Sequence, residues 1–283
     1  MKFSVTCEGG AYRTIFSSAV LDVFLDEKLH CDYFVGVSAG FAYGLSYLSG
    51  QKRRNLDILQ RYGADRRYLS FWNLFNPRNK SVYGLQFAFY DVPLEHVALD
   101  FDALESSCAR SFAAVTNVHS GKGQYLPAAG REALLDIVLA TCAMPALFPI
   151  VEYQGAQYMD GGITNPIPFA LALDAGYEKN IVILTRERTY EKHQERVLTL
   201  AAGLYRKYPA FVKALRCRSA VYNAQREQLF ELERQGRVLV ITPQDTSYFG
   251  RMERNPAKIL ELYKQGLRVT RERLPQIKEY LEI

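Results

Sequence analysis

A short apolar stretch that ends in Gly36-Val37-Ser38-Ala39-Gly40 constrains the fold of this chain more than any other feature. Residues 33–37 predict a buried strand, and the mostly apolar residues 41–48 predict a helix. Between a strand and a helix, G-x-S-x-G is typical of a nucleophile elbow, because the sharp turn exposes the serine hydroxyl and the glycines avoid a clash. A glycine-rich turn without chemistry has the same pattern. Ser38 is therefore a candidate nucleophile that the rest of the chain must support.

The first 37 residues predict a β-α-β unit that ends at this turn. Residues 2–7 predict a strand, residues 8–13 a glycine turn, and a helix is expected from Arg13 to about Lys28. The strand before Ser38 should then lie parallel to the first, with a right-handed crossover. Both glycine turns would lie at the carboxyl ends of adjacent strands, where open α/β sheets bind their ligands.

The remaining segments extend this pattern to residue 241. Further strands are expected at 111–117, 124–127 (a hairpin with the one before), 155–159, 181–185 and 237–241. Helices are expected at 51–67, 132–140, 198–235 with a break at Pro209, and from Asn255-Pro256 to the end. We therefore expect an α/β fold with a mostly parallel central sheet flanked by helices, and a helical C-terminal extension.

Composition and cysteine usage narrow the class of protein. The 283 residues are 48% hydrophobic and 23% charged, as in an ordinary globular protein. No apolar run approaches the ~18 residues of a membrane span, and Glu8 with its glycines follows the first strand too soon for a signal peptide. Five scattered cysteines without a C-x-x-C pair favour reduced thiols, and so a cytoplasmic location, over a disulfide framework or a zinc site.

The positive charge is concentrated in the last third of the chain. Residues 1–180 carry 15 Lys and Arg against 18 Asp and Glu, whereas residues 181–283 carry 20 against 12. Such an excess could attract an anionic membrane surface or nucleic acid. Solvated helix faces would give the same count.

A serine nucleophile needs a base, and histidine is poorly placed to supply it. His30 precedes the strand that ends at Ser38, so at ~3.3 Å per residue it belongs at the far end of the sheet. The other histidines, His96, His119 and His193, lie in polar or loop-like surroundings that favour a surface role. Asp160 is the better candidate, because it ends a strand before Gly161-Gly162 and should lie at the edge that carries Ser38. Partial burial would raise its pKa toward the range of a general base, although an ordinary turn has the same sequence.

Gly9-Gly10 is the natural candidate for an oxyanion site. Backbone amides in a glycine turn at the start of a helix converge on an anion, and Arg13 would stiffen the loop or add positive charge. The stretch lacks the spacing of a phosphate-binding loop.

Together these motifs resemble the patatin-like phospholipase family, which combines a glycine-rich oxyanion loop ending in arginine, a G-x-S-x-G elbow and a D-G-[GA] motif. They stand here as residues 8–13, 36–40 and 160–162, in the family's order and spacing. Residues 142–149 are similar to its A-x-P-x-x-F-P segment, and residues 165–168 to its N-P-x-P. The resemblance covers about residues 3–185 and implies a patatin-like three-layer catalytic core there. Residues 186–283 would be a helical extension that adds a late strand to the same domain.

The resemblance implies a lipid acyl ester hydrolase of the phospholipase or lysophospholipase type. Ser38 would attack the acyl carbonyl, Asp160 would accept its proton, and the amides of Gly9, Gly10 and Ala11 would hold the oxyanion with Arg13 in support. This chemistry requires no metal and no other cofactor. The expected partner is a lipid ester, at a membrane surface if the protein is peripheral to one.

Two departures from the family pattern motivate an alternative. Ala11 replaces the third loop glycine and Thr14 the glycine usual after the arginine, and alanine tolerates a positive φ poorly. A catalytically weak lipid-binding or regulatory protein that keeps the fold is therefore the second hypothesis. Nucleic-acid binding through the basic C-terminal third is a third, disfavoured because no basic-aromatic motif is present.

The segment 71–80, Phe-Trp-Asn-Leu-Phe-Asn-Pro-Arg-Asn-Lys, is unusually aromatic. It predicts either a lid or lipid-facing flap, or a loop that folds over the core.

Overall fold

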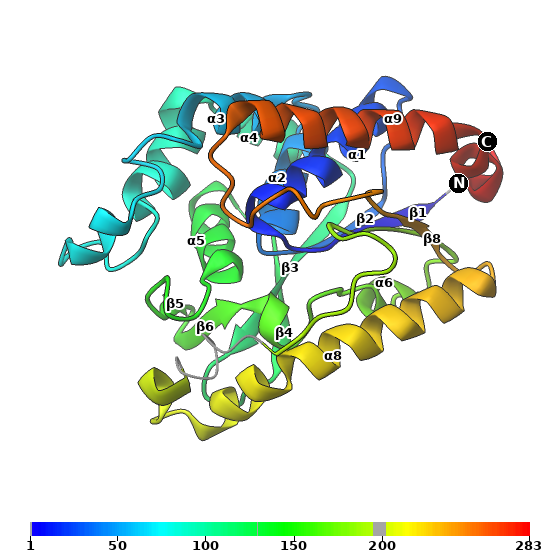
Figure 1. Cartoon of the computed structure of the whole chain (residues 1–283). Helices are drawn as coiled ribbons and strands as arrows, with labels where there is room; N and C mark the ends of the chain where they lie inside the picture. Colours follow the sequence, from blue (N-terminus) through cyan, green and yellow to red (C-terminus); the bar gives the residue numbers. More distant parts are fainter. Residues whose placement is uncertain (1, 129, 195–201) are drawn as a thin grey trace.

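The computed structural model describes residues 2–128, 130–194 and 202–283. Within these residues one sheet of eight strands has the order β5-β6-β3-β2-β1-β7-β8, with β4 paired to β3 off this path (Figure 1). The strands are β1 Phe3–Cys7, β2 Tyr33–Val37, β3 Arg110–Asn117, β4 Gly123–Pro127, β5 Val151–Tyr153, β6 Ala156–Asp160, β7 Lys179–Ile183 and β8 Leu239–Ile241.

The centre of the sheet is parallel. β1 pairs in parallel with β2 and β7, β2 with β3, and β7 with β8, whereas β4, β5 and β6 pair antiparallel. Every residue of β1 and β2 is buried, because helices cover both faces of a parallel sheet. The polar residues of β1 do not mark an exposed face: the hydroxyl of Ser4 donates to the Asn180 side chain at 2.6 Å. The predicted α/β fold is confirmed.

Helices form a layer on each face of this sheet (Figure 1). On one face lie α1 (Ile15–Asp26), α2 (Ala39–Leu48), α3 (Arg54–Tyr62), α5 (Arg131–Cys142) and α9 (Pro256–Leu281), and on the other α6 (Ala170–Asp174) and α8 (Pro209–Arg234). Phe34 of β2 packs into the cluster of the first layer, and Tyr33 and Val35 pack beside α6. α9 approaches α1 so closely that a Cβ at Gly266 would lie 2.7 Å from the Phe16 carbonyl oxygen.

The C-terminal region shares the central sheet, since β8 pairs with β7. The domain boundary expected at residue 185 stays a prediction. Asn255 caps α9 by accepting a hydrogen bond from the Ala257 amide, with Pro256 in the first turn as predicted. The helix expected at 198–235 corresponds to α8, which begins at Pro209; residues 198–201 lie outside the described residues.

Other elements differ from the expectation in extent. The first helix opens with a 3₁₀ turn, η1 (Ala11–Thr14), and the helix expected at 51–67 is the shorter α3. The three-residue β5 and a π-helix, η3 (Phe87–His96), were not predicted, because so short a strand and a helix containing Pro93 carry no periodic signal. The remaining short helices are η2 (Phe71–Phe75), α4 (Phe101–Glu105), η4 (Gly161–Ile163) and η5 (Ala202–Tyr205).

The aromatic segment does not fold over the core. Phe71, Trp72 and Phe75 of η2 are 70%, 74% and 77% exposed, and the Trp72 and Phe75 rings lie 5.9 Å apart. Of the two alternatives for this segment, the loop folded over the core is therefore wrong. Among the described helices, none has the length and apolar character to cross a bilayer.

Candidate active site

The two strands on either side of β3, β2 and β6, end beside neighbouring residues of β3. Val37, the last residue of β2, is paired with Ala114, and Asp160, the last residue of β6, is paired with the next residue, Val115. Ser38 directly follows Val37. Because the two strand ends occupy successive positions along β3, the structure brings Ser38 and Asp160 into the lining of one cavity.

Ser38 has the strained backbone that is typical of a nucleophile elbow. Its φ of 55° and ψ of −133° lie outside the regions that side-chain-bearing residues usually adopt. Gly36 and Gly40 are required by close contact, since a Cβ would lie 2.4 Å from the Cα of Phe41 and 2.5 Å from the Cys7 carbonyl oxygen, respectively.

A buried threonine attaches this turn to β3. The Ser38 amide donates to the Thr141 hydroxyl at 2.8 Å, and that hydroxyl donates to the Ala114 carbonyl at 2.6 Å. Thr141 is fully buried. The hydrogen bonds therefore hold the strained turn against the strand that also positions Asp160.

Asp160 is a buried carboxyl group, 7% exposed. Burial raises its pKa above the ordinary value of 3.8, while a hydrogen bond with the Ser38 side chain, the Gly162 amide and the charges of Arg218 and Arg251 oppose the rise. The Gly162 amide donates to Asp160 Oδ1 at 2.7 Å. The Asp160 backbone is fixed on both sides, by the Ala143 carbonyl and by the Thr116 hydroxyl, each at 2.9 Å.

The glycine loop passes directly beside the elbow. A Cβ at Gly9 would lie 2.8 Å from the Val37 carbonyl oxygen and 2.9 Å from Ser38 Cβ. The amides on either side of the loop are engaged: Glu8 donates to the Ile183 carbonyl and Tyr12 to the Arg251 carbonyl. Across the described ranges, no acceptor meets the amides of Gly9, Gly10 and Ala11, so these donors are available at the site.

Ala11 has a φ of 49°, a left-handed conformation that favours glycine. The expected strain at this position is therefore present. Arg13 does not sit at the surface: it is 7% exposed and lines the same cavity as Ser38. Burial and then the charges of Arg186 and Arg251 lower its pKa to about 10, and Glu8 opposes the change.

Ser38, Ala11 and Met144 lie between two cavities of different chemistry. One, the polar cavity, has a volume of about 150 Å³ and contains Asp160, Gly9 and Gly10 in its lining. The other, the apolar cavity, has a volume of about 60 Å³ and is largely aromatic; it is lined by Tyr12, Tyr43, Tyr68, Tyr83, Phe89, Phe148, Ala39, Ala42 and Cys142 besides the three shared residues.

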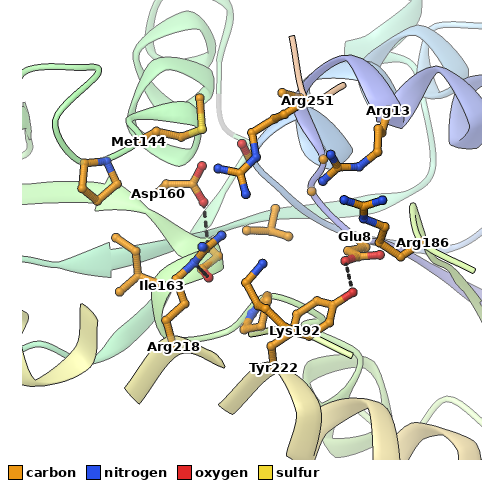
Figure 2. Close-up of a pocket in the computed structure, with 18 of the residues that line it drawn as sticks. Glu8, Arg13, Met144, Asp160, Ile163, Arg186, Lys192, Arg218, Tyr222 and Arg251 are labelled. Atoms are coloured by element: carbon orange, nitrogen blue, oxygen red, sulfur yellow. Dashed lines mark hydrogen bonds between the residues drawn. The ribbon is translucent and has the colours of Figure 1, made fainter. Parts of the chain in front are cut away.

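Five basic side chains, which we call the basic wall, line the polar cavity (Figure 2). They are Arg13, Arg186, Lys192, Arg218 and Arg251. Only Arg13 was predicted as a site residue. The others come from the basic C-terminal third, where the charge excess was the only signal and gave no positions. That excess therefore contributes side chains to the site, besides any role at the surface.

The four histidines lie elsewhere. His30, His96, His119 and His193 are all exposed, and the cavity that the described residues form around Ser38 has none of them in its lining. Nor do three or more histidine, cysteine or acidic side chains gather in the described part of the chain as a metal site would require.

A family model described as patatin-like phospholipase matches residues 5–173. The chain belongs to the patatin-like phospholipase family. The family is one of lipid hydrolases, and the patatin-like match contains Ser38, Asp160 and the glycine loop. A second family model, described as a domain of unknown function, matches residues 208–282. The basic wall thus draws Arg218 and Arg251 from this second match, and Arg186 and Lys192 also lie outside the patatin-like match.

Two further similarities accompany the patatin-like match. The uncharacterized protein YjjU of Escherichia coli (strain K12) is 27% identical over 198 residues, which cover 65% of this chain and 52% of YjjU, so the chain spans about half the length of that curated relative. The crystal structure of VipD from Legionella pneumophila aligns with 97% of this chain and 67% of that chain, at a TM-score of 0.47 and 13% identity.

The left-handed conformation of Ala11 can be tested by substitution. Ala11→Gly should leave the melting temperature equal or slightly raised, because relief of a strain of roughly 1–2 kcal/mol offsets the added entropy of the unfolded chain. Ala11→Val should destabilise by about 1 kcal/mol or more, since a β-branched side chain is poorly accommodated at this φ. Thermal denaturation measures both. A valine variant as stable as the glycine variant would contradict the strained geometry.

Proposed function

We propose that this protein is a serine-dependent acyl ester hydrolase of the phospholipase or lysophospholipase type, with Ser38 as nucleophile and Asp160 as proton acceptor. One observation carries the proposal. The strained Ser38 lies near a buried carboxyl group and the glycine loop, at the junction of a polar and an apolar cavity, and three amides of that loop have no acceptor among the described residues.

The steps follow from these positions. Asp160 takes the Ser38 proton as Oγ attacks the acyl carbonyl carbon, and the negative charge that develops on the carbonyl oxygen is held by the amides of Gly9, Gly10 and Ala11. The protonated Asp160 gives its proton to the departing alkoxide, which leaves an acyl-serine. A water molecule, deprotonated by Asp160, then releases the fatty acid and restores the serine.

Burial prepares Asp160 for this role. A carboxylate at its ordinary pKa is a weak base toward a serine hydroxyl, and the burial of Asp160 raises its pKa. Its carboxyl group is oriented by the Gly162 amide, which donates to Oδ1, and the Gly162 carbonyl in turn accepts a hydrogen bond from Arg218 Nε at 3.0 Å. The base is thus a positioned group, which is what proton transfer to a single atom requires.

The apolar cavity supplies the lipid specificity of the proposal. Its aromatic lining offers an acyl chain a site removed from water directly beside the attacking oxygen. Ala42 and Phe148 belong to this lining and not to that of the polar cavity. An amphiphilic ester would therefore place its chain and its polar part on opposite sides of Ser38.

We also propose that the protein acts at a membrane surface through η2. Phe71, Trp72 and Phe75 form an exposed aromatic group, and exposed basic residues flank it: Arg66, Arg67, Arg78 and Lys80. Aromatic side chains next to basic ones suit the interface of an anionic bilayer.

All five cysteines are free thiols, which supports the expected reducing, cytoplasmic location.

The dyad is tested by hydrolysis of p-nitrophenyl butyrate. Ser38→Ala and Asp160→Asn should each lower kcat/KM by about 100-fold or more, because the first removes the nucleophile and the second the base. His119→Ala, at an exposed side chain outside the lining of the cavity, is the control. Full activity in Asp160→Asn would remove the aspartate from the mechanism, and a wild-type rate no higher than that of Ser38→Ala would favour the lipid-binding alternative.

The burial of the Asp160 carboxyl group also predicts how the stability of the protein depends on pH. Its pKa is raised by folding above the ordinary value of 3.8, so ionisation in the folded state costs stability as the pH rises. Asp160→Asn should therefore melt at a higher temperature than wild type at pH 8, with the difference shrinking as the pH falls toward 4. If Asp160→Asn is less stable than wild type at pH 8, and the difference grows with pH, the predicted sign is contradicted.

The raised pKa of Asp160 also predicts the pH dependence of activity. Wild-type kcat/KM should rise with pH along an acid limb that lies above the ordinary pKa of 3.8.

Membrane binding is tested by vesicle sedimentation. Trp72→Ser with Phe75→Ser should weaken binding to phosphatidylglycerol vesicles about tenfold or more, since each aromatic side chain loses roughly 1.5–3 kcal/mol of burial. Leu204→Ser removes an equally exposed apolar side chain from η5 and serves as control. Equal binding of the double variant and the control would overturn the role of η2.

A further inference from the structure

The polar cavity is strongly cationic. Its lining contains the five basic side chains of the basic wall but only two carboxyl groups, Glu8 and Asp160. Glu8 is already engaged: Tyr222 donates to one of its oxygens at 2.7 Å and the Thr185 amide to the other at 2.6 Å. Asp160 is the proton acceptor of the proposed reaction. The cavity thus holds an excess of positive charge beside the nucleophile.

Arg13 is the member of the basic wall whose burial is most costly. It is 7% exposed, and within the described residues its buried Nε has no hydrogen-bond partner. Its neighbours Arg186 and Arg251 carry like charges, and together with burial they lower its pKa to about 10. A buried guanidinium with an unsatisfied donor beside like charges is stabilised when an anion binds between them.

Arg186 is held in a fixed orientation beside it. One terminal nitrogen donates to the Thr246 hydroxyl at 2.9 Å, and the guanidinium lies 4.4 Å from the centre of the Tyr190 ring. Its Nε is buried and, in the part of the chain that the structure describes, unpartnered as well. A guanidinium fixed by one hydrogen bond and one ring offers its remaining donors to a ligand at little entropic cost.

The location of the basic wall determines which part of a substrate meets it. With the ester carbonyl at Ser38 and the acyl chain in the apolar cavity, the alcohol part of the ester extends into the polar cavity. In a glycerophospholipid, the phosphate lies only a few bonds from the ester on that side. The polar cavity has a volume of about 150 Å³. One water molecule needs roughly 15 Å³ on the same scale, so the cavity has room for a phosphate group.

We propose that the basic wall binds the phosphate of an anionic glycerophospholipid or lysophospholipid, so that the enzyme selects headgroups of net negative charge over phosphatidylcholine. This inference rests on the proposed function, because it assigns the alcohol side of the ester to the polar cavity. Arginine recognises phosphate with several charge-assisted hydrogen bonds. The same excess of positive charge repels the quaternary ammonium of choline, so the selection combines attraction of anionic headgroups with repulsion of choline.

The selection is measured with short-chain lipids that are dispersed as monomers, so that binding to a surface cannot contribute. The ratio of kcat/KM for dihexanoyl phosphatidylglycerol to that for dihexanoyl phosphatidylcholine should be about tenfold or more in wild type. It should fall to near one in Arg186→Gln with Arg251→Gln. Arg188→Gln is the matched control, since Arg188 lies two residues from Arg186 and pairs with Glu233 outside the cavity; its ratio should equal that of wild type.

A binding experiment tests the phosphate site independently of hydrolysis. Ser38→Ala protein should be stabilised against heat by sn-glycerol 3-phosphate and not by glycerol, and the added Arg186→Gln and Arg251→Gln changes should abolish the shift. If wild type hydrolyses no ester, the proposed function fails while a phosphate-dependent shift still supports a phosphate site at the basic wall. Equal hydrolysis of the two lipids overturns the headgroup proposal, and in that case a shift assigns the site to a free phosphate ester. If the melting temperature does not shift and neither lipid is preferred, both the headgroup proposal and the phosphate site are overturned.

Discussion

The site depends on the pairing of two strand ends with neighbouring residues of β3. Val37 pairs with Ala114 and Asp160 with Val115, so the residue after one strand and the last residue of the other lie at a similar level on the two sides of β3. The Ala114 carbonyl also accepts the Thr141 hydroxyl that binds the Ser38 amide. It approaches Gly161 so closely that a Cβ there would lie 2.2 Å away. A shift of one residue in this register would separate the proposed nucleophile, Ser38, from the proposed base, Asp160.

Several features of the site lower the stability of the folded chain. Ser38 and Ala11 have positive φ angles, and Asp160 is a buried carboxyl group. Arg13 is a buried guanidinium whose Nε has no partner among the described residues. The surrounding core can hold such a site because the central strands are buried on both faces. Strain and buried charge in one place, inside a well-packed sheet, are typical of a functional site. They also give the proposed chemistry its base and its oxyanion donors.

Sequence reasoning could place the residues that lie in short motifs. Ser38 follows a strand with a clear apolar pattern and the loop glycines precede a helix, so their common edge follows from the rules for parallel sheets. Asp160 also ends a strand, but β6 pairs antiparallel with β3, so its place at this edge depends on how far β6 extends along β3. Ala11 could be predicted as strained because alanine stands where a positive φ is needed. In each case local sequence determines local geometry.

The rest of the basic wall could not be predicted in this way. Arg186 follows β7, Arg218 lies on α8, and Arg251 lies in the loop before α9, so only the tertiary fold brings them to one cavity. No spacing connects them in sequence. Arg251 shows how closely the C-terminal region is joined to the site, because its carbonyl accepts the Tyr12 amide beside the glycine loop. A charge count can indicate such a wall but cannot locate it.

The central claim is that Ser38 is an activated nucleophile, and the most direct test is covalent modification. Wild-type protein treated with a fluorophosphonate should gain the mass of one adduct, and peptide mapping should place that adduct on Ser38. Asp160→Asn should be modified far more slowly, since the base that activates Ser38 is gone. An adduct on another residue, or a wild-type chain that remains unmodified, would contradict the account.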